Sequence, residues 1–175
     1  MTRPLPRPTP DDAAPYYFTY IDQVPAGDVL EVLASGVAET RRSLAGIDRA
    51  TEGFRYAPGK WTVREALGHV VDAERVFGYR AFHVARGDAS PLPSMDPDAY
   101  ARTAGADRRP LAQLLDELEH LRTSHLLLFR GLDDAAWERS GIASDVPVRV
   151  RALPFILAGH EIHHRRILVE RYLKR

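Results

Sequence analysis

A chain of 175 residues, 45% of them hydrophobic, has the length and composition of one globular domain with a sizeable core. Its 24 Lys and Arg balance its 24 Asp and Glu, which argues against a nucleic-acid backbone or an anionic membrane as its main partner. The absence of cysteine excludes disulfides, thiolate metal ligands and a cysteine nucleophile, so any metal must be bound by His, Asp or Glu.

The N-terminal segment MTRPLPRPTPDD lacks the apolar centre of a signal peptide, and the chain has no run of about 18 apolar residues that could span a bilayer. We therefore expect a cytoplasmic protein. Five of the first fifteen residues are proline, which disfavours a helix. Residues 1–15 are predicted to be a flexible arm, followed by a single domain over residues 16–175.

The first half of the domain is predicted to contain two long helices. Apolar residues at spacings of three, four and seven predict the first over residues 28–46. Thr62 and Glu65 match the capping box that begins many helices, and they predict the second over residues 63–86.

A long crossover separates the second long helix from the third. The pair Asp96-Pro97 is typical of a helix start and predicts a short helix over residues 99–102. A leucine-rich stripe predicts the third long helix between Pro110 and Gly131.

The last part of the chain is predicted to end in a fourth long helix. One helical turn is expected at DDAAWER, followed by a connector, SGIASDVPVRV, that can include a short extended piece. The final helix is predicted over residues 152–172. Four long helices with one crossover between the second and third indicate an all-α four-helix bundle.

Three histidines fall within five positions of the last predicted helix. His160 and His164 are one turn apart on its apolar face, whereas His163 lies at the flank. A single inward histidine can be a core residue whose nitrogens bond to neighbours. Burying two imidazoles without a strong partner costs roughly a few kcal/mol, and a shared cation offsets that cost.

A metal site in a bundle needs ligands from facing helices, and His69 of the second long helix is the leading third ligand. Alanines on the same face leave room for a cation. Glu65 and Asp72 lie four residues before and three after His69, where a carboxylate could orient its ring. The alternative is a helix cap for Glu65 and a solvated face for Asp72.

The other histidines are weaker candidates. His125 lies on the apolar side of the third helix and is either a fourth ligand or, more simply, a core histidine. His120 groups with polar residues and is expected at the surface. His83, near the end of the second helix, is expected outside the site.

His160, Glu161 and His164 also satisfy the H-E-x-x-H pattern of zinc proteases. Those enzymes need a third ligand, either a histidine six positions after the motif or a glutamate on a later helix. Position 170 is Glu and lies on the same helix, and neither ligand is present in these 175 residues. No sheet that could shape a peptide cleft is predicted, so the match is interpreted as a coincidence of spacing.

Two segments, APGKWTVREALGHVVDAERVFGYRAFHVARGD and ALPFILAGHEIHHRRIL, resemble the signature segments of the DinB-like (YfiT-like) superfamily of metal-binding four-helix bundles. The resemblance covers residues 17–173. It implies a divalent metal held by His69, His160 and His164, often in a homodimer. Characterised relatives use bacillithiol or mycothiol, as S-transferases and a maleylpyruvate isomerase do, and others are described as metal-dependent hydrolases.

Three neutral histidines leave a cation with an open position, where a bound water or a cosubstrate thiolate would become the nucleophile. Zinc, nickel, iron and manganese all accept imidazole, and zinc or nickel is expected. Glu161 is a weak candidate for the base, with a surface charge as the alternative. Tyr100 and Arg102 of the crossover could cover the site.

Two further arginines, Arg165 and Arg166, would attract an anionic substrate if they faced the mouth of the site, although the helix dipole also explains them. Two functions remain open. One is a metal-dependent enzyme acting on a small molecule, either a thiol S-transferase or a hydrolase. The other is a non-catalytic metal- or ligand-binding bundle of a stress response, which a fourth ligand such as His125 would favour.

Overall fold

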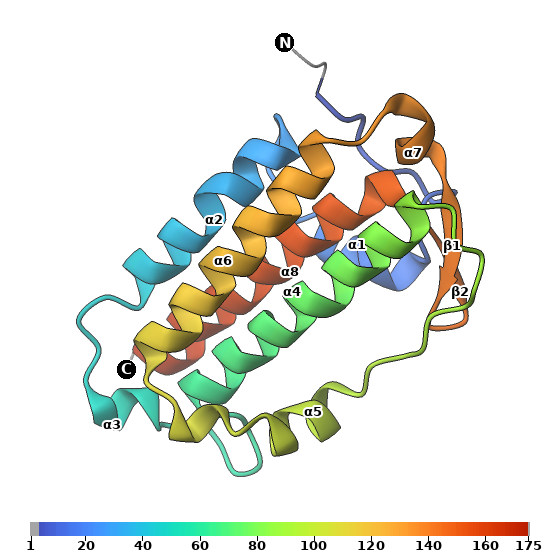
Figure 1. Ribbon diagram of the computed structural model, residues 1–175. Helices are drawn as coiled ribbons and strands as arrows, with labels where there is room; N and C mark the ends of the chain where they lie inside the picture. Colours follow the sequence, from blue (N-terminus) through green and yellow to red (C-terminus); the bar gives the residue numbers. More distant parts are fainter. Residues whose placement is uncertain (1–3, 175) are drawn as a thin grey trace.

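Four long helices lie side by side in the structure (Figure 1), a computed structural model that describes residues 4–174. They form the bundle that the sequence predicted, and their apolar faces make the core. Helices α2 and α4 each pack against both α6 and α8, so that α2 and α4 lie diagonally across the bundle. The bounds of the four helices are α2 (Val29–Ser43), α4 (Val63–Ala85), α6 (Leu111–Arg130) and α8 (Leu153–Ile167).

The predicted start of α4 is confirmed by its hydrogen bonds. The Thr62 side chain accepts from the Glu65 backbone N–H at 3.0 Å, and the Glu65 carboxylate accepts from the Thr62 N–H at 2.8 Å. Both bonds satisfy N–H groups that have no partner within the helix, which contributes about 1 kcal/mol per cap. This cap sets the first residue of α4, the helix that carries His69.

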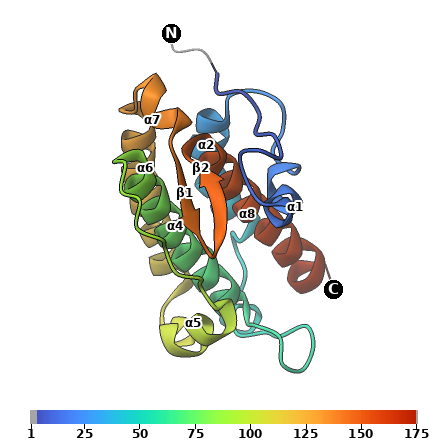
Figure 2. The same ribbon diagram turned by 90° about the vertical axis from the view of Figure 1, so that its right-hand side faces the viewer.

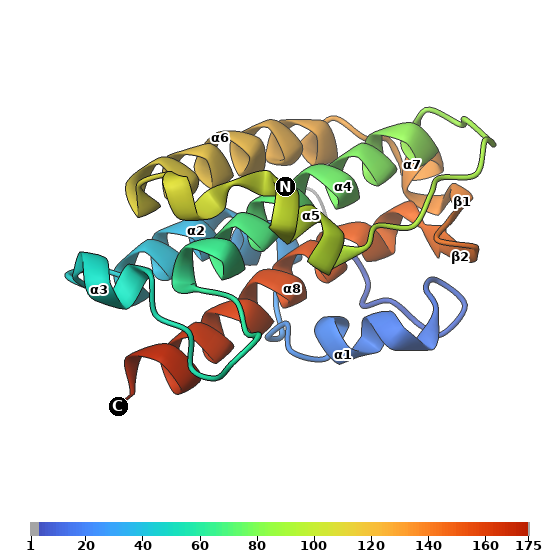
Figure 3. The ribbon, with the colours of Figure 1, turned by 90° about the horizontal axis from the view of Figure 1, so that it is seen from below.

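The crossover between α4 and α6 runs along the outside of the bundle and carries α5 (Pro97–Ala104), as Figure 3 shows from below. Its N-cap is Asp96, as predicted, but the helix is longer than the expected residues 99–102. The crossover packs against α4 and so covers the side of the bundle where His69 lies.

A two-stranded antiparallel sheet, β1 (Ser140–Ala143) with β2 (Val146–Arg149), follows α7 (Asp134–Glu138) near one end of the bundle (Figure 2). Its turn residues Ser144 and Asp145 have φ of 56° and 62°. Positive φ at both turn residues is typical of a two-residue hairpin. The predicted extended piece is confirmed, and its pairing into a hairpin is new.

Two short helices not expected from the sequence pack beside the long ones, α1 (Phe18–Ile21) against α8 and α3 (Arg49–Glu52) against α4. The last helix continues past α8 in a π-helical segment, Leu168–Leu173, so the predicted range 152–172 is confirmed. None of the helices in residues 4–174 is long and apolar enough to cross a membrane.

The prediction of a flexible arm over residues 1–15 is wrong for residues 7–14, while residues 1–3 lie outside the described part of the chain. Arg7 donates to the Ile21 carbonyl at 2.6 Å, and the buried Asp12 pairs with Arg151 at 2.7 Å. Ala13 forms a β-bridge with Val148. These contacts hold the proline-rich segment against the domain, although its residues 7–14 form no helix.

Candidate metal centre

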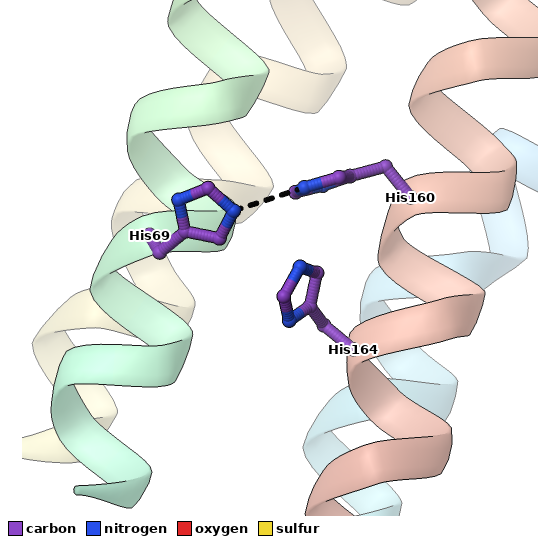
Figure 4. Close-up of side chains that lie close together, drawn as sticks. All are labelled: His69, His160 and His164. Carbon is purple, nitrogen blue, oxygen red and sulfur yellow. Dashed lines mark hydrogen bonds between the residues drawn. The ribbon is translucent and has the colours of Figure 1, made fainter. Parts of the chain in front are cut away.

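His69 of α4 and His160 and His164 of α8 point toward one another in the space between the two helices (Figure 4). Each offers a ring nitrogen, and the three nitrogens lie within 4.8 Å of one another. The Nε2 atoms of His69 and His160 are 3.0 Å apart. Residues 91 positions apart in the sequence are therefore brought together, as the helical spacing predicted.

The surroundings keep these imidazoles neutral. Burial lowers the pKa of His69 to about 4, although the charge of Asp98 acts in the opposite direction. Burial, with help from neighbouring histidines, lowers the pKa of His164 to about 3 and that of His160 well below its ordinary value. The neutral ring carries the lone pair that binds metal, so the cluster has the protonation state that a ligand set requires.

The Nδ1 atom of His69 is buried and has no hydrogen-bond partner within residues 4–174. The prediction that Glu65 or Asp72 orients this ring is wrong. Glu65 caps α4 and pairs with Arg55, and the ion-pair partner of Asp72 is Arg75. The ring is instead held by packing, because the Trp61 ring lies 4.9 Å away between centroids.

Tyr20 of α1 forms a second wall of the cluster. Its ring meets His160 edge-on at 5.2 Å and His163 at 5.5 Å. Gly159 makes this approach possible, because a Cβ there would lie 2.1 Å from the Tyr20 carbonyl oxygen. The close packing of α1 on α8 therefore depends on one glycine next to a candidate ligand.

The remaining histidines lie outside the cluster. His163 is at the flank, as predicted, where Gln23 donates to its Nδ1 at 3.3 Å. His125 donates to Glu74 at 2.9 Å and is not a fourth member of the cluster, so its interpretation as a core histidine is correct. His120 is exposed, and His83 donates to the Ser90 carbonyl at 2.9 Å.

The prediction of Glu161 as a base is contradicted by its position in the core. Its carboxylate pairs with the buried Arg122 at 2.8 Å and accepts from Thr40 at 2.7 Å. Both partners lie on other helices, so the sequence of α8 alone contains no sign of them. Glu161 belongs to a buried ion-pair network and not to the cluster.

A cleft of about 400 Å³ opens beside the histidines, with His69 and His160 in its wall. Arg165 lies elsewhere and pairs with Glu39, and the exposed Arg166 is also absent from the lining. Tyr100 and Arg102 do not line it either, and the crossover contributes Ser94, Met95 and Pro97 to its wall instead. The cleft is also lined by residues that the sequence did not mark as site candidates, and many of them are aromatic or small: Ala14, Tyr16, Tyr17, Tyr20, Phe77, Arg80, Ser94, Met95, Pro97, Ser144 and Val146.

Sequence comparison decides the family. Residues 32–168, most of the chain and all four long helices of the bundle except the first residues of α2, match the DinB superfamily. The chain belongs to the DinB superfamily.

Relatives of this DinB-superfamily chain are described as metal enzymes. One relative is a protein of Geobacillus kaustophilus (strain HTA426) whose name gives it the inferred function of a metal-dependent hydrolase. It is 26% identical over 149 residues, which are 81% of this chain and 83% of the relative's chain. YfiT from Bacillus subtilis, assigned by inference as a metal-dependent hydrolase with an unusual four-helix bundle topology, has a TM-score of 0.76. It is 17% identical, and the match covers 84% of this chain and 87% of YfiT.

A mycothiol-dependent maleylpyruvate isomerase also shares the fold, with a TM-score of 0.64 and 18% identity. The match covers 82% of this chain but 61% of the isomerase. At these identities the two solved structures establish the bundle fold for this chain, whereas the reaction has to be argued from the site.

Proposed function

We propose that this chain is an enzyme that uses one divalent metal ion bound by His69, His160 and His164. The observation that supports it is the convergence of three neutral imidazoles, those of His69 and His160 buried in the wall of a cleft and that of His164 half-buried beside them. Holding three rings at this distance is unfavourable without a shared partner, and the unpartnered His69 Nδ1 adds to that cost. Zinc or nickel suits this donor set best.

Three neutral ligands suit a catalytic site better than a closed structural one, because an ion held by them lowers the pKa of a water or thiol that it binds. Within residues 4–174 no fourth histidine or carboxylate joins the cluster. His125, the residue that could have closed it, bonds to Glu74 instead. This arrangement supports an enzyme over a non-catalytic binder.

The chain's own side chains in the cleft bind and position more than they transfer protons. No Asp or Glu lines the described part of the cleft, and Glu161 is held in the core. With no cysteine in the chain, a nucleophile brought by a small cosubstrate fits best. We therefore propose transfer of a low-molecular-weight thiol as the first reaction and hydrolysis as the second, which the names of the hydrolase relatives support.

Metal analysis with His69→Ala and His160→Ala tests this proposal, beside the exposed control His120→Ala. Wild type and control should bind one zinc or nickel per chain, and each cluster variant should bind at least tenfold more weakly. The same samples are assayed for conjugation of a small thiol to monochlorobimane and for hydrolysis of p-nitrophenyl acetate. Either activity should require the metal and disappear in both cluster variants.

Two results would count against the proposal. Metal retained at full affinity in both cluster variants would remove the ligand assignment. Metal bound as proposed with neither activity would favour the non-catalytic binder. The family resemblance also supports a homodimer, which light scattering of the purified protein measures directly.

A further inference from the structure

Arg80 is a buried charge in the same cleft as the histidines. It is 4% exposed and follows His69 by eleven residues on α4. Eleven residues are three turns, so both side chains lie on one face of the helix, roughly 16 Å apart along its axis. Ala73, Val76 and Phe77 lie between them and also line the cleft.

Among the described residues, every hydrogen-bond partner of Arg80 is neutral. Its guanidinium donates to the Tyr17 hydroxyl at 3.2 Å, the Ser144 hydroxyl at 2.7 Å and the Pro93 carbonyl at 3.0 Å. Its carbon Cζ lies 5.4 Å from the centroid of the Phe77 ring. Within residues 4–174 no carboxylate forms an ion pair with it.

The second deeply buried arginine shows what this fold does with a charge that needs no ligand. Arg122 is 2% exposed and pairs with two buried carboxylates, Glu74 and Glu161, both at 2.8 Å. A buried guanidinium without an anion costs several kcal/mol of desolvation that hydrogen bonds to neutral groups offset only in part. Among residues 4–174, Arg80 therefore has no counterion of the kind that Arg122 has.

Three separate segments hold the Arg80 fork in place. Ser144 is at the tip of the hairpin, where its φ of 56° is uncommon for a residue other than glycine. Its N–H donates to the Leu92 carbonyl at 3.0 Å, which ties the hairpin to the crossover. The guanidinium is thus held in place and has N–H donors beyond those used in these hydrogen bonds. Its planar arrangement of donors suits a carboxylate.

We propose that Arg80 binds the carboxylate of an elongated organic acid whose apolar body lies along the aromatic wall of the cleft. The other end of such a molecule would reach the histidine cluster. That this acid is the substrate, or the thiol cosubstrate, rests on the proposed function. The anion site itself depends only on Arg80 and its surroundings.

Binding of matched acids and amides tests the site. The probes are linear and phenyl-substituted carboxylic acids from acetate to 4-phenylbutyrate, each beside its primary amide, titrated into zinc-loaded and chelator-treated full-length protein. A charge-assisted bond is worth about 1.5–3 kcal/mol, so at least one acid should bind about tenfold or more tightly than its amide. The ratio should fall to near one in Arg80→Met and Arg80→Gln.

The variants separate the possible outcomes. Arg80→Met leaves no buried carboxylate unpaired and should fold, as circular dichroism checks, and Arg80→Gln serves if it does not. Arg86→Met, which removes an exposed arginine at the C-cap of α4, should keep the wild-type ratio. A preference for acids that persists without zinc supports the anion site even if the metal proposal fails.

Two findings would overturn the inference. If no acid of the series binds better than its amide, Arg80 only ties α4 to the hairpin and the crossover. If the preference survives in Arg80→Met and Arg80→Gln but disappears when zinc is removed, the carboxylate binds at the histidine cluster instead.

Discussion

Single residues decide which buried charges are part of the core and which are available for binding. Arg122 joins Glu74 of α4 and Glu161 of α8 into one network, with a further bond to the Leu33 carbonyl of α2. Arg80 has no such counterions among the described residues. The same residue type therefore serves stability at one position and, we infer, ligand binding at the other.

The network predicts an acid-sensitive contribution to stability. Burial alone would raise the pKa of Glu74, but Arg122 and His125 lower it from 4.5 to about 2. The folded state then holds the carboxylate charged where the unfolded state has already bound a proton. Its stabilisation is present above pH 4.5 and is lost as the pH falls toward 2.

Urea unfolding at pH 5 and pH 3 measures this effect. Between these values Glu74 should account for on the order of 2 kcal/mol of the lost free energy of unfolding. Glu74→Gln should be less stable at pH 5 and lose correspondingly less on acidification. An equal loss in wild type and Glu74→Gln would show that the carboxylate is not held charged by Arg122.

Helix positions explain how much of the site could be predicted from the sequence. His69, His160 and His164 were found because each lies on an apolar stripe of one helix, and periodicity shows such stripes. The carboxylate of Glu161 was misplaced because its partner, Arg122, is on α6, and one helix gives no information about the residues of another. The position of Arg80 in the cleft could have been predicted from helical periodicity, since Arg80 lies on the face of α4 that carries His69.

The small elements were harder to predict than the long helices. One capping box, apolar periodicity and one leucine stripe predicted the bundle to within a few residues, whereas α1 and α3 have only four residues each and too little periodicity to detect. The hairpin depends on pairing and on Ser144 and Asp145 at positive φ, a turn for which glycine and asparagine are the usual signals. Of these small elements, α1 and the hairpin supply walls of the cleft.

The contact of α1 with α8 predicts the effect of one methyl group. Gly159→Ala would place a Cβ 2.1 Å from the Tyr20 carbonyl oxygen, so α1 must move away from the candidate ligand His160. The free energy of unfolding should fall by about 1–3 kcal/mol, the usual cost of overpacking, as measured in urea. Gly131→Ala, whose Cβ has no neighbour closer than 3.4 Å, should cost clearly less.

At the scale of the whole molecule, the bundle supplies two rigid helices and the added segments supply the cleft. Helices α4 and α8 carry the three histidines, and the crossover, the hairpin and the N-terminal residues close around them. An ion at the cluster would join the neighbouring helices α4 and α8. The central claim is therefore that three imidazoles from these two helices bind the same ion.

X-ray absorption spectroscopy of the zinc-loaded protein tests that claim most directly. Zinc should show imidazole nitrogens at about 2.0–2.1 Å, with three imidazoles in wild type and two or fewer in His69→Ala if that variant still binds zinc. A wild-type spectrum without imidazole ligands, or an unchanged three-imidazole shell in His69→Ala, would contradict the proposed site.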